Sequence, residues 1–201
     1  MVMVLVEILA RLITSFISQI GYIGVFFLMV LESALIPIPS EVIMPFSGFL
    51  VSTGEFNLLY VLIAGVIGNL VGSVITYYLG LSIGRTFVLR YGKYLLIDEN
   101  HLELAESWFR KFGDKIILVS RNLPAVRTYI SLPAGISKMN VFKFAIYTLI
   151  GSVPWNFALL YSGVLLGKNW ETVLRYTTIL DGIVIAIIII LVIWWLRKRI
   201  K

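Results

Sequence analysis

The sequence contains no cysteine and only one histidine among its 201 residues, and charged residues make up just 14% of it. Without cysteine there are no disulfides and no thiol chemistry, and a lone His101 makes a histidine-built metal site unexpected. We therefore expect neither a metal nor another cofactor. Because a soluble domain carries about 25% charged residues, the low charge and the mean hydropathy of +0.95 predict an integral membrane protein of one domain.

The charges that are present are unbalanced, because 17 Lys and Arg stand against 11 Asp and Glu and give a net charge of +6. The basic residues cluster between apolar segments, so positive-inside topology and anionic lipid headgroups explain them better than nucleic acid does. The basic end of the sequence, residues 197–201, predicts a cytoplasmic C-terminus.

Two acids and two prolines interrupt an otherwise apolar region between residues 21 and 52. An acid such as Glu32 or Glu41 costs roughly 2.5–3.5 kcal/mol at the centre of a bilayer unless it meets a partner or a wet cavity. Pro37 and Pro39 break the helix, which hydrocarbon tolerates only where protein or water satisfies the freed backbone groups. Each apolar arm has about 10 residues, or about 15 Å of helix, which is half the thickness of the hydrocarbon layer. We predict a re-entrant helical hairpin with these four residues near its tip.

The same interruption recurs between residues 116 and 137 with the opposite charge. Arg121, Pro124, Arg127 and Pro133 lie in this second apolar region. A second re-entrant hairpin accommodates them, with Pro124 and Pro133 expected at its tip. If the two tips meet, the four charges neutralise one another around a polar cavity. The simpler alternative is a pair of ion bridges that only holds the hairpins together. The functional reading is that arginine binds an anion such as phosphate, while a carboxylate in low dielectric binds and releases a proton.

Apolar runs and charged connectors divide the chain into five parts. The first part is amphipathic with helical periodicity, and the connector in the middle is the most polar. The predicted fold is an all-α polytopic membrane protein made of an interfacial helix (1–20), a first hairpin-plus-crossing unit (21–84), a cytoplasmic amphipathic connector (85–115), a second such unit (116–167) and a C-terminal transmembrane helix (176–196).

The two hairpin-plus-crossing units match one another in register. Five residues of the first unit each have an identical residue 83 positions later, namely Asn57, Gly68, Tyr78, Gly80 and Gly84. The units have opposite predicted topology, so the match indicates the inverted repeat of transporters, whose substrate sites lie where broken helices meet near the midplane. We expect the glycines of both units to permit close helix packing. These glycines are Gly48, Gly68, Gly72, Gly80, Gly84, Gly135, Gly151 and Gly163.

These motifs resemble the DedA family, also called the SNARE-associated or VTT-domain family. The resemblance rests on Glu32-Ser-x-x-x-Pro37-x-Pro39-Ser-Glu41, on Gly48, on Arg121-x-x-Pro124-x-x-Arg127 with Ala134-Gly135, and on Tyr78-x-Gly80-x-x-x-Gly84-Arg85. It covers roughly residues 20–167 and implies a lipid transporter of the prokaryotic cytoplasmic membrane with two opposed re-entrant hairpins. It also implies that Glu32 and Glu41 are the functional acids and that Arg121 and Arg127 are the functional arginines.

We predict a flippase that moves a phosphate-bearing lipid, foremost a polyprenyl phosphate of the undecaprenyl type, with proton coupling. The two arginines are expected to hold the phosphate, and the two glutamates to pair with them in the empty site and to take up protons. One alternative is a flippase or scramblase for phosphatidylethanolamine or another phospholipid; others are an intramembrane lipid phosphatase and a purely structural adaptor. A phosphatase requires a histidine or clustered metal-binding carboxylates beside the arginines. The only histidine, His101, lies in the connector, so a transporter is favoured over an enzyme. The expected partners are the lipid and protons, with a homo-oligomer left open.

Overall fold

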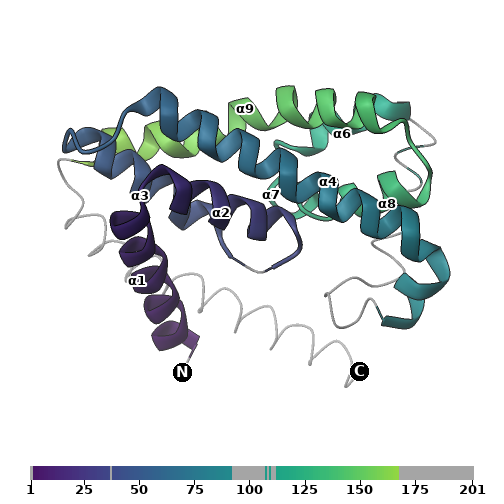
Figure 1. The fold of residues 1–201 in the computed structure, drawn as a ribbon, viewed down its shortest axis with the longest axis horizontal. Coiled ribbons are helices and arrows are strands. Elements are labelled where there is room, and N and C mark those ends of the chain that lie inside the picture. The colour runs from purple at the N-terminus through teal and green to yellow at the C-terminus, as the bar shows by residue number, and fades with distance from the viewer. Residues whose placement is uncertain (1, 37, 92–106, 108, 110–111, 168–201) are drawn as a thin grey trace, which may run out of the picture.

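The computed structural model describes residues 2–36, 38–91, 107, 109 and 112–167 (Figure 1). All regular structure in these residues is helical, in agreement with the predicted fold class. The segments are α1 (Val2–Ile20), α2 (Tyr22–Ser33), α3 (Ser40–Ser52), α4 (Leu58–Tyr91), the 3₁₀ turn η2 (Gly113–Lys115), α6 (Ile116–Ser120), α7 (Pro124–Arg127), α8 (Ser131–Ile136) and α9 (Val141–Leu166). The predicted features that lie outside the described residues are Pro37, His101, most of the connector 85–115 and the C-terminal crossing 176–196.

Among the described residues, α4 over Leu58–Ser82 and α9 are long and apolar enough to cross a membrane. Each begins at an asparagine whose side chain caps it. The side-chain oxygen of Asn57 accepts a hydrogen bond from the N–H of Leu59 at 2.9 Å. That of Asn140 accepts one from the N–H of Phe142 at 3.0 Å. Both caps satisfy backbone donors that have no partner within the first helical turn.

The ends of these helices can be compared with the predicted ends of the two hairpin-plus-crossing units, residues 84 and 167. α9 ends at Leu166, next to the predicted end. α4 continues to Tyr91, beyond the predicted end at Gly84, because residues 85–91 contain neither proline nor glycine to stop it. α4 and α9 pack against each other and run in opposite directions (Figure 1).

The first apolar region is interrupted where the sequence predicts. α2 ends at Ser33, Leu35 adopts a left-handed backbone conformation with φ 69°, and Pro39 is the N-cap of α3. The chain reverses across this interruption, so that α3 runs back toward the start of α2 (Figure 1). α2 packs along α4, whereas α3 packs along α9.

The second apolar region is more fragmented than the predicted two-armed hairpin. It consists of three short helices, because the chain turns at residues 121–123 and again at residues 128–130. Pro124 is the first residue of α7, where a backbone N–H would have no intrahelical acceptor, so proline loses no hydrogen bond. Pro133 lies buried inside α8, not at a tip as expected. Such short pieces are marginal alone, so they depend on packing, α6 against α9 and α8 against α4.

Glycines permit backbone contact where the interrupted segments cross the long helices. A methyl group at Gly48 of α3 would overlap the carbonyl oxygen of Leu160 in α9, and one at Gly163 would overlap that of Pro45. The contact between α8 and α4 is of the same kind, since a methyl group at Gly135 would overlap the carbonyl oxygen of Tyr77. The other predicted packing glycines with close neighbours are Gly68 and Gly72 toward α2, Gly80 toward α8 and Gly151 toward α6; the surroundings of Gly84 lie outside the described residues.

The apolar core joins α1, α2, α3, α4 and α9, and α1 enters it through Ile13 and Ile17. The predicted amphipathic helix over residues 1–20 is therefore present, while its place at the membrane interface stays a prediction. The outer faces of α4 and α9 expose large apolar side chains, as a surface in contact with lipid does. They include Ile63, Ile67 and Ile75 on α4 and Ile150, Phe157 and Leu165 on α9.

Candidate functional site

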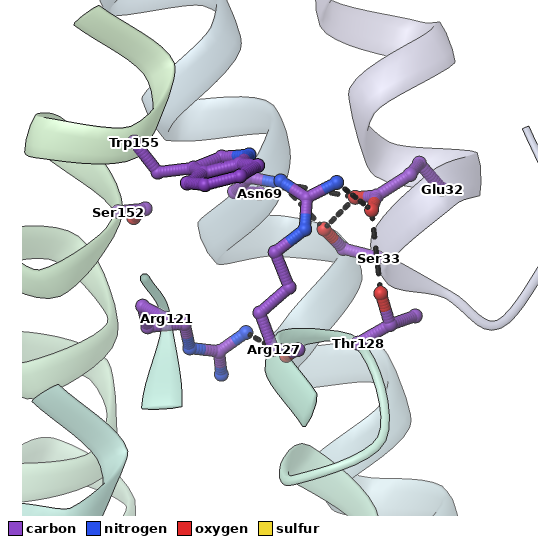
Figure 2. Close-up of a pocket in the computed structure, with 8 residues that line it drawn as sticks. All are labelled: Glu32, Ser33, Asn69, Arg121, Arg127, Thr128, Ser152 and Trp155. Carbon is purple, nitrogen blue, oxygen red and sulfur yellow. Dashed lines mark hydrogen bonds and ion pairs between the residues drawn. The ribbon is translucent and has the colours of Figure 1, made fainter. Parts of the chain in front are cut away.

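One polar pocket lies where the interrupted segments meet the two long helices (Figure 2). It receives three of the four charged residues predicted for the site, Glu32, Arg121 and Arg127. Side chains fill it so closely that the remaining space takes at most about one water molecule. Its lining consists of Glu32 and Ser33 of α2, Asn69 of α4, Arg121, Arg127 of α7, Thr128, and Ser152 and Trp155 of α9.

The centre of the pocket is a buried ion pair between Arg127 and Glu32, which are 6% and 5% exposed. Arg127 Nη2 donates to Glu32 Oε1 at 2.8 Å. The second carboxylate oxygen accepts hydrogen bonds from Ser33 Oγ at 2.9 Å and Asn69 Nδ2 at 3.2 Å. Thr128 Oγ1 adds a longer contact to Oε1 at 3.3 Å. Because removing one partner of such a pair leaves a buried charge, it costs roughly 3–5 kcal/mol.

The second acid, Glu41, lies at the rim of the pocket. Arg127 Nη2 also contacts Ser40 Oγ and, at 3.4 Å, Glu41 Oε1. The Glu41 side chain is 47% exposed, against 6% for that of Glu32. The expectation that both acids are buried is therefore wrong for Glu41. The reason is local: Ser40 points inward from the first turn of α3, and the next residue of a helix points about 100° away from it.

Arg121 is held by neutral oxygen atoms and, among the described residues, by no carboxylate. It is 3% exposed, and its guanidinium lies 5.6 Å from the centroid of the Phe144 ring. The expected arrangement of two arginine–glutamate pairs is thus wrong, because Arg127 takes both carboxylates. The four acceptors of Arg121 are Ser73 Oγ at 2.9 Å, the Arg127 main-chain oxygen at 2.8 Å, Ser131 Oγ at 2.9 Å and Thr148 Oγ1 at 3.0 Å.

These contacts make Arg121 a link between four elements. Its acceptors belong to α4, α7, α8 and α9, so one side chain ties both long helices to the second interrupted segment. The bond to the Arg127 carbonyl also satisfies a backbone group near the end of α7, where intrahelical donors run out. Arg121 therefore positions the peptide that carries Arg127.

Trp155 forms the wall of the pocket on the α9 side. The ring lies over the Arg127 guanidinium, with 5.3 Å between Cζ and the ring centroid (Figure 2). This cation–π contact leaves the guanidinium edge free for hydrogen bonds. Two buried donors at this wall, Trp155 Nε1 and Arg127 Nε, meet no hydrogen-bond acceptor in the described part of the chain.

A chain of amides connects the ion pair to both long helices. Asn156 Nδ2 donates to Asn69 Oδ1 at 2.6 Å, across the contact between α9 and α4, and Asn69 in turn donates to Glu32. Sequence reasoning missed both asparagines. A signal was available, because each is a buried amide in the middle of an apolar crossing, where polar side chains are costly and take part in interhelical contacts.

The serine and threonine residues of the site could not be recognised from the sequence in this way. Serine and threonine are common in membrane helices, where they bond to the carbonyl of the preceding turn of their own helix. Ser152 does so here, to Thr148, whereas Ser73 turns to Arg121 instead. The local sequence does not distinguish the two cases.

The chemistry available at the pocket is anion binding and proton exchange. Arginine offers a charged fork of donors, and a glutamate oxygen accepts either a hydrogen bond or a proton. Within the described residues no three histidine, aspartate or glutamate side chains gather as a metal site would need. The pocket therefore presents one buried cation–anion pair, next to a second cation whose two terminal nitrogens each donate two hydrogen bonds.

Comparison with known proteins gives one matching domain family and several relatives that cover most of this chain. The VTT domain matches residues 38–165 of the chain. A Bacillus subtilis protein named undecaprenyl phosphate transporter A is 35% identical over 191 residues, which cover 93% of this chain and 93% of the relative. A Lactococcus lactis protein named alkaline phosphatase-like protein is 36% identical over 198 residues, covering 94% and 92%. Protein DedA of Escherichia coli is 27% identical over 158 residues, covering 73% and 68%. No solved structure matches.

Proposed function

Because the chain belongs to the VTT-domain family, also known as the DedA family, we propose that it is a membrane transporter that moves a phosphate-bearing lipid between leaflets. The relative named undecaprenyl phosphate transporter A spans almost the whole chain and supports a polyprenyl phosphate as the lipid. The observation that carries the proposal is the buried pair of Arg127 and Glu32, in which a guanidinium already holds an oxyanion.

The proposed binding step is an exchange of anions on Arg127. Glu32 pairs with the guanidinium, and the space left beside them is too small for a phosphate group. We propose that a lipid phosphate takes the place of the carboxylate, because arginine binds both groups through the same planar fork of N–H donors. The side chains of Arg127 and Glu32 must separate for this exchange to happen.

Charge matching favours a phosphate monoester over a diester. Arg127 contacts two carboxylates, at 2.8 and 3.4 Å. A phosphate monoester carries about −1.5 to −2 charges at pH 7, so it can replace both carboxylates without leaving Arg127 undercompensated. A phosphatidylethanolamine headgroup carries a single phosphate charge together with an ammonium, which would compete for Glu32 and Glu41 instead.

Protons enter the proposed cycle at Glu32. Once phosphate holds Arg127, the buried Glu32 carboxylate has lost its cation and retains only neutral hydrogen-bond donors. An unpaired buried carboxylate is costly, and uptake of a proton removes that cost. Lipid binding and proton binding thus support each other, and the release of either favours the release of the other. Glu41 at the rim is the route by which we propose protons reach Glu32.

The proposed movement is a rocking of two inverted repeats around the pocket. The contacts of the two units correspond: Gly48 of α3 meets the carbonyl oxygen of Leu160, and Gly135 of α8 meets that of Tyr77. Leu160 and Tyr77 are 83 positions apart, the same separation as the two asparagines that cap α4 and α9. This reciprocity supports an inverted repeat with two opposed re-entrant segments, and we propose a cytoplasmic C-terminus for it.

Transport in liposomes tests the proposal. The full chain is reconstituted with a fluorescent polyprenyl phosphate in one set of vesicles and a fluorescent phosphatidylethanolamine in another, each with and without a pH gradient. We expect transbilayer movement of the polyprenyl phosphate, faster with a gradient and lost in Arg127→Ala. Faster movement of phosphatidylethanolamine would show that this phospholipid, not a polyprenyl phosphate, is the substrate. Release of free inorganic phosphate would show that the protein is a phosphatase and not a transporter. Leu165→Ala, at an exposed site on α9, is the matched control.

A further inference from the structure

Trp155 offers the pocket a hydrogen-bond donor that the ion pair does not use. Its Nε1 atom is buried, lies in the pocket wall and has no acceptor among the described residues. Arg127 Nε, on a side chain that is 8% exposed, also has no acceptor among the described residues. Buried donors without acceptors are rare in folded proteins, and such a group calls for an explanation by a bound partner or a functional role.

The chemistry of the two donors limits what can bind to them. An indole N–H and a guanidinium N–H both donate and neither accepts, so their common partner must be an acceptor. An ammonium group cannot satisfy either of them. The Trp155 ring also lies over the Arg127 guanidinium, 5.3 Å from it. The indole and the guanidinium are therefore adjacent and line the same pocket (Figure 2).

We propose that Trp155 is a specificity-determining residue that donates its indole N–H to an oxygen of the anionic headgroup held by Arg127. The inference rests on the proposed function, since it takes the headgroup to be a phosphate. Arg127 Nη2 donates to Glu32, whereas Arg127 Nε and Trp155 Nε1 are the donors that the headgroup takes when it enters. The indole then selects an anionic phosphate over a zwitterionic headgroup whose ammonium faces the same wall. When Glu32 separates from Arg127, the face of the Trp155 ring still stabilises the position of the guanidinium.

A conservative substitution separates this role from packing. Trp155→Phe keeps an aromatic face over Arg127 and removes only the N–H donor and the second ring. Tyr161→Phe removes an aromatic donor from the same helix at an exposed position outside the pocket and serves as the control. The probes are farnesyl monophosphate and its alcohol, farnesol, titrated into the full chain in detergent micelles. We expect Trp155→Phe to weaken farnesyl monophosphate binding about tenfold, the effect of one hydrogen bond to a charged group, with farnesol binding unchanged.

The indole proton gives a second readout that does not depend on the variant. In protein labelled with ¹⁵N-tryptophan, the five indole signals include one that Trp155→Phe removes and thereby assigns. Farnesyl monophosphate should shift this signal downfield in the wild-type chain, and farnesol should not. If the wild-type chain does not bind farnesyl monophosphate, the proposed function fails. If it binds but the Trp155 signal stays in place, or if Trp155→Phe binds as tightly as Tyr161→Phe, the role of Trp155 is overturned while the proposed function stands. Equal loss of farnesol binding would assign Trp155 to the lipid tail and also overturn it.

Discussion

Arg121 Nη1 donates a hydrogen bond to the main-chain oxygen of Arg127 at 2.8 Å, so one buried arginine holds the peptide group that carries the other. The two residues look equivalent in the sequence, but their surroundings differ. Arg127 meets two carboxylates, whereas Arg121 meets three hydroxyls and this carbonyl. An exchangeable ligand suits the first arrangement, and a fixed scaffold suits the second.

The first prediction concerns this difference. Lysine at position 121 keeps the charge but cannot reach four acceptors that lie around a planar fork, so Arg121→Lys should lower the free energy of unfolding by about 3 kcal/mol. Lysine at position 127 can still pair with Glu32, so Arg127→Lys should destabilise less while losing transport. Thermal unfolding in detergent, followed by circular dichroism, compares the two. An Arg121→Lys protein of normal stability without transport would assign Arg121 to lipid binding instead.

The second prediction concerns the competition between Glu32 and an anionic headgroup for Arg127. Arg127 Nη2 donates to Glu32 Oε1 at 2.8 Å, so an anion that binds this nitrogen must displace the carboxylate. Glu32→Gln removes the competing charge and should bind farnesyl sulfate more tightly than the wild-type chain, although loss of the ion pair should destabilise the protein by about 3 kcal/mol. Glu41→Gln, at the exposed rim, is the control and should change the affinity less. Calorimetric titration measures this, and unchanged or weaker binding by Glu32→Gln would show that Glu32 does not compete for Arg127.

The third prediction tests the correspondence between the two units. A methyl group at Gly163 would overlap the carbonyl oxygen of Pro45, and one at Gly80 would overlap that of Leu132. Overpacking of this kind costs about 1–3 kcal/mol, and Gly163→Ala and Gly80→Ala should be destabilised alike. Chemical denaturation of both variants beside Leu165→Ala measures this. A large loss in one glycine variant and none in the other would argue against equivalent roles.

The fourth prediction concerns the amide bridge between α9 and α4. Asn156 Nδ2 and Asn69 Oδ1 are 2.6 Å apart in a buried setting. A double-mutant cycle of Asn69→Ala and Asn156→Ala should give a coupling energy of about 0.6–1.7 kcal/mol, the range for hydrogen bonds between membrane helices. Because Asn69 also donates to Glu32, Asn69→Ala should alter anion binding more than Asn156→Ala does. Additive effects on stability would show that the bridge contributes nothing.

Local chemistry made much of the fold predictable. Asn57 and Asn140 cap the two long helices because their side chains satisfy donors within their own first turns. Pro39 is the N-cap of α3 and Pro124 begins α7, because the fixed φ and missing N–H of proline suit the start of a helix. The close contacts at Gly48 and Gly163 follow from the need for small residues between membrane helices. These features depend on neighbours in sequence or on a general requirement of the bilayer.

The partners of the charged residues could not be predicted in the same way. Glu32 and Glu41 flank the same interruption, yet only the geometry of the first turn of α3 sends Glu41 to the rim. The acceptors of Arg121 are neutral oxygens that lie 6 to 48 positions away in sequence, and such contacts depend on how the helices pack. The three-part second segment follows from the same contacts, because short helices form only where packing supports them.

The sequence by itself determined that this chain is apolar, helical, interrupted twice and charged at both interruptions, because residue composition and helix-breaking chemistry act locally. Only the tertiary structure decided that Arg127 contacts both carboxylates, that Arg121 donates to the Arg127 main-chain oxygen, and that Asn69 and Trp155 complete the pocket. Hydrogen bonds of about 3 Å act over such short distances that their assignment requires the packed positions of all the helices involved.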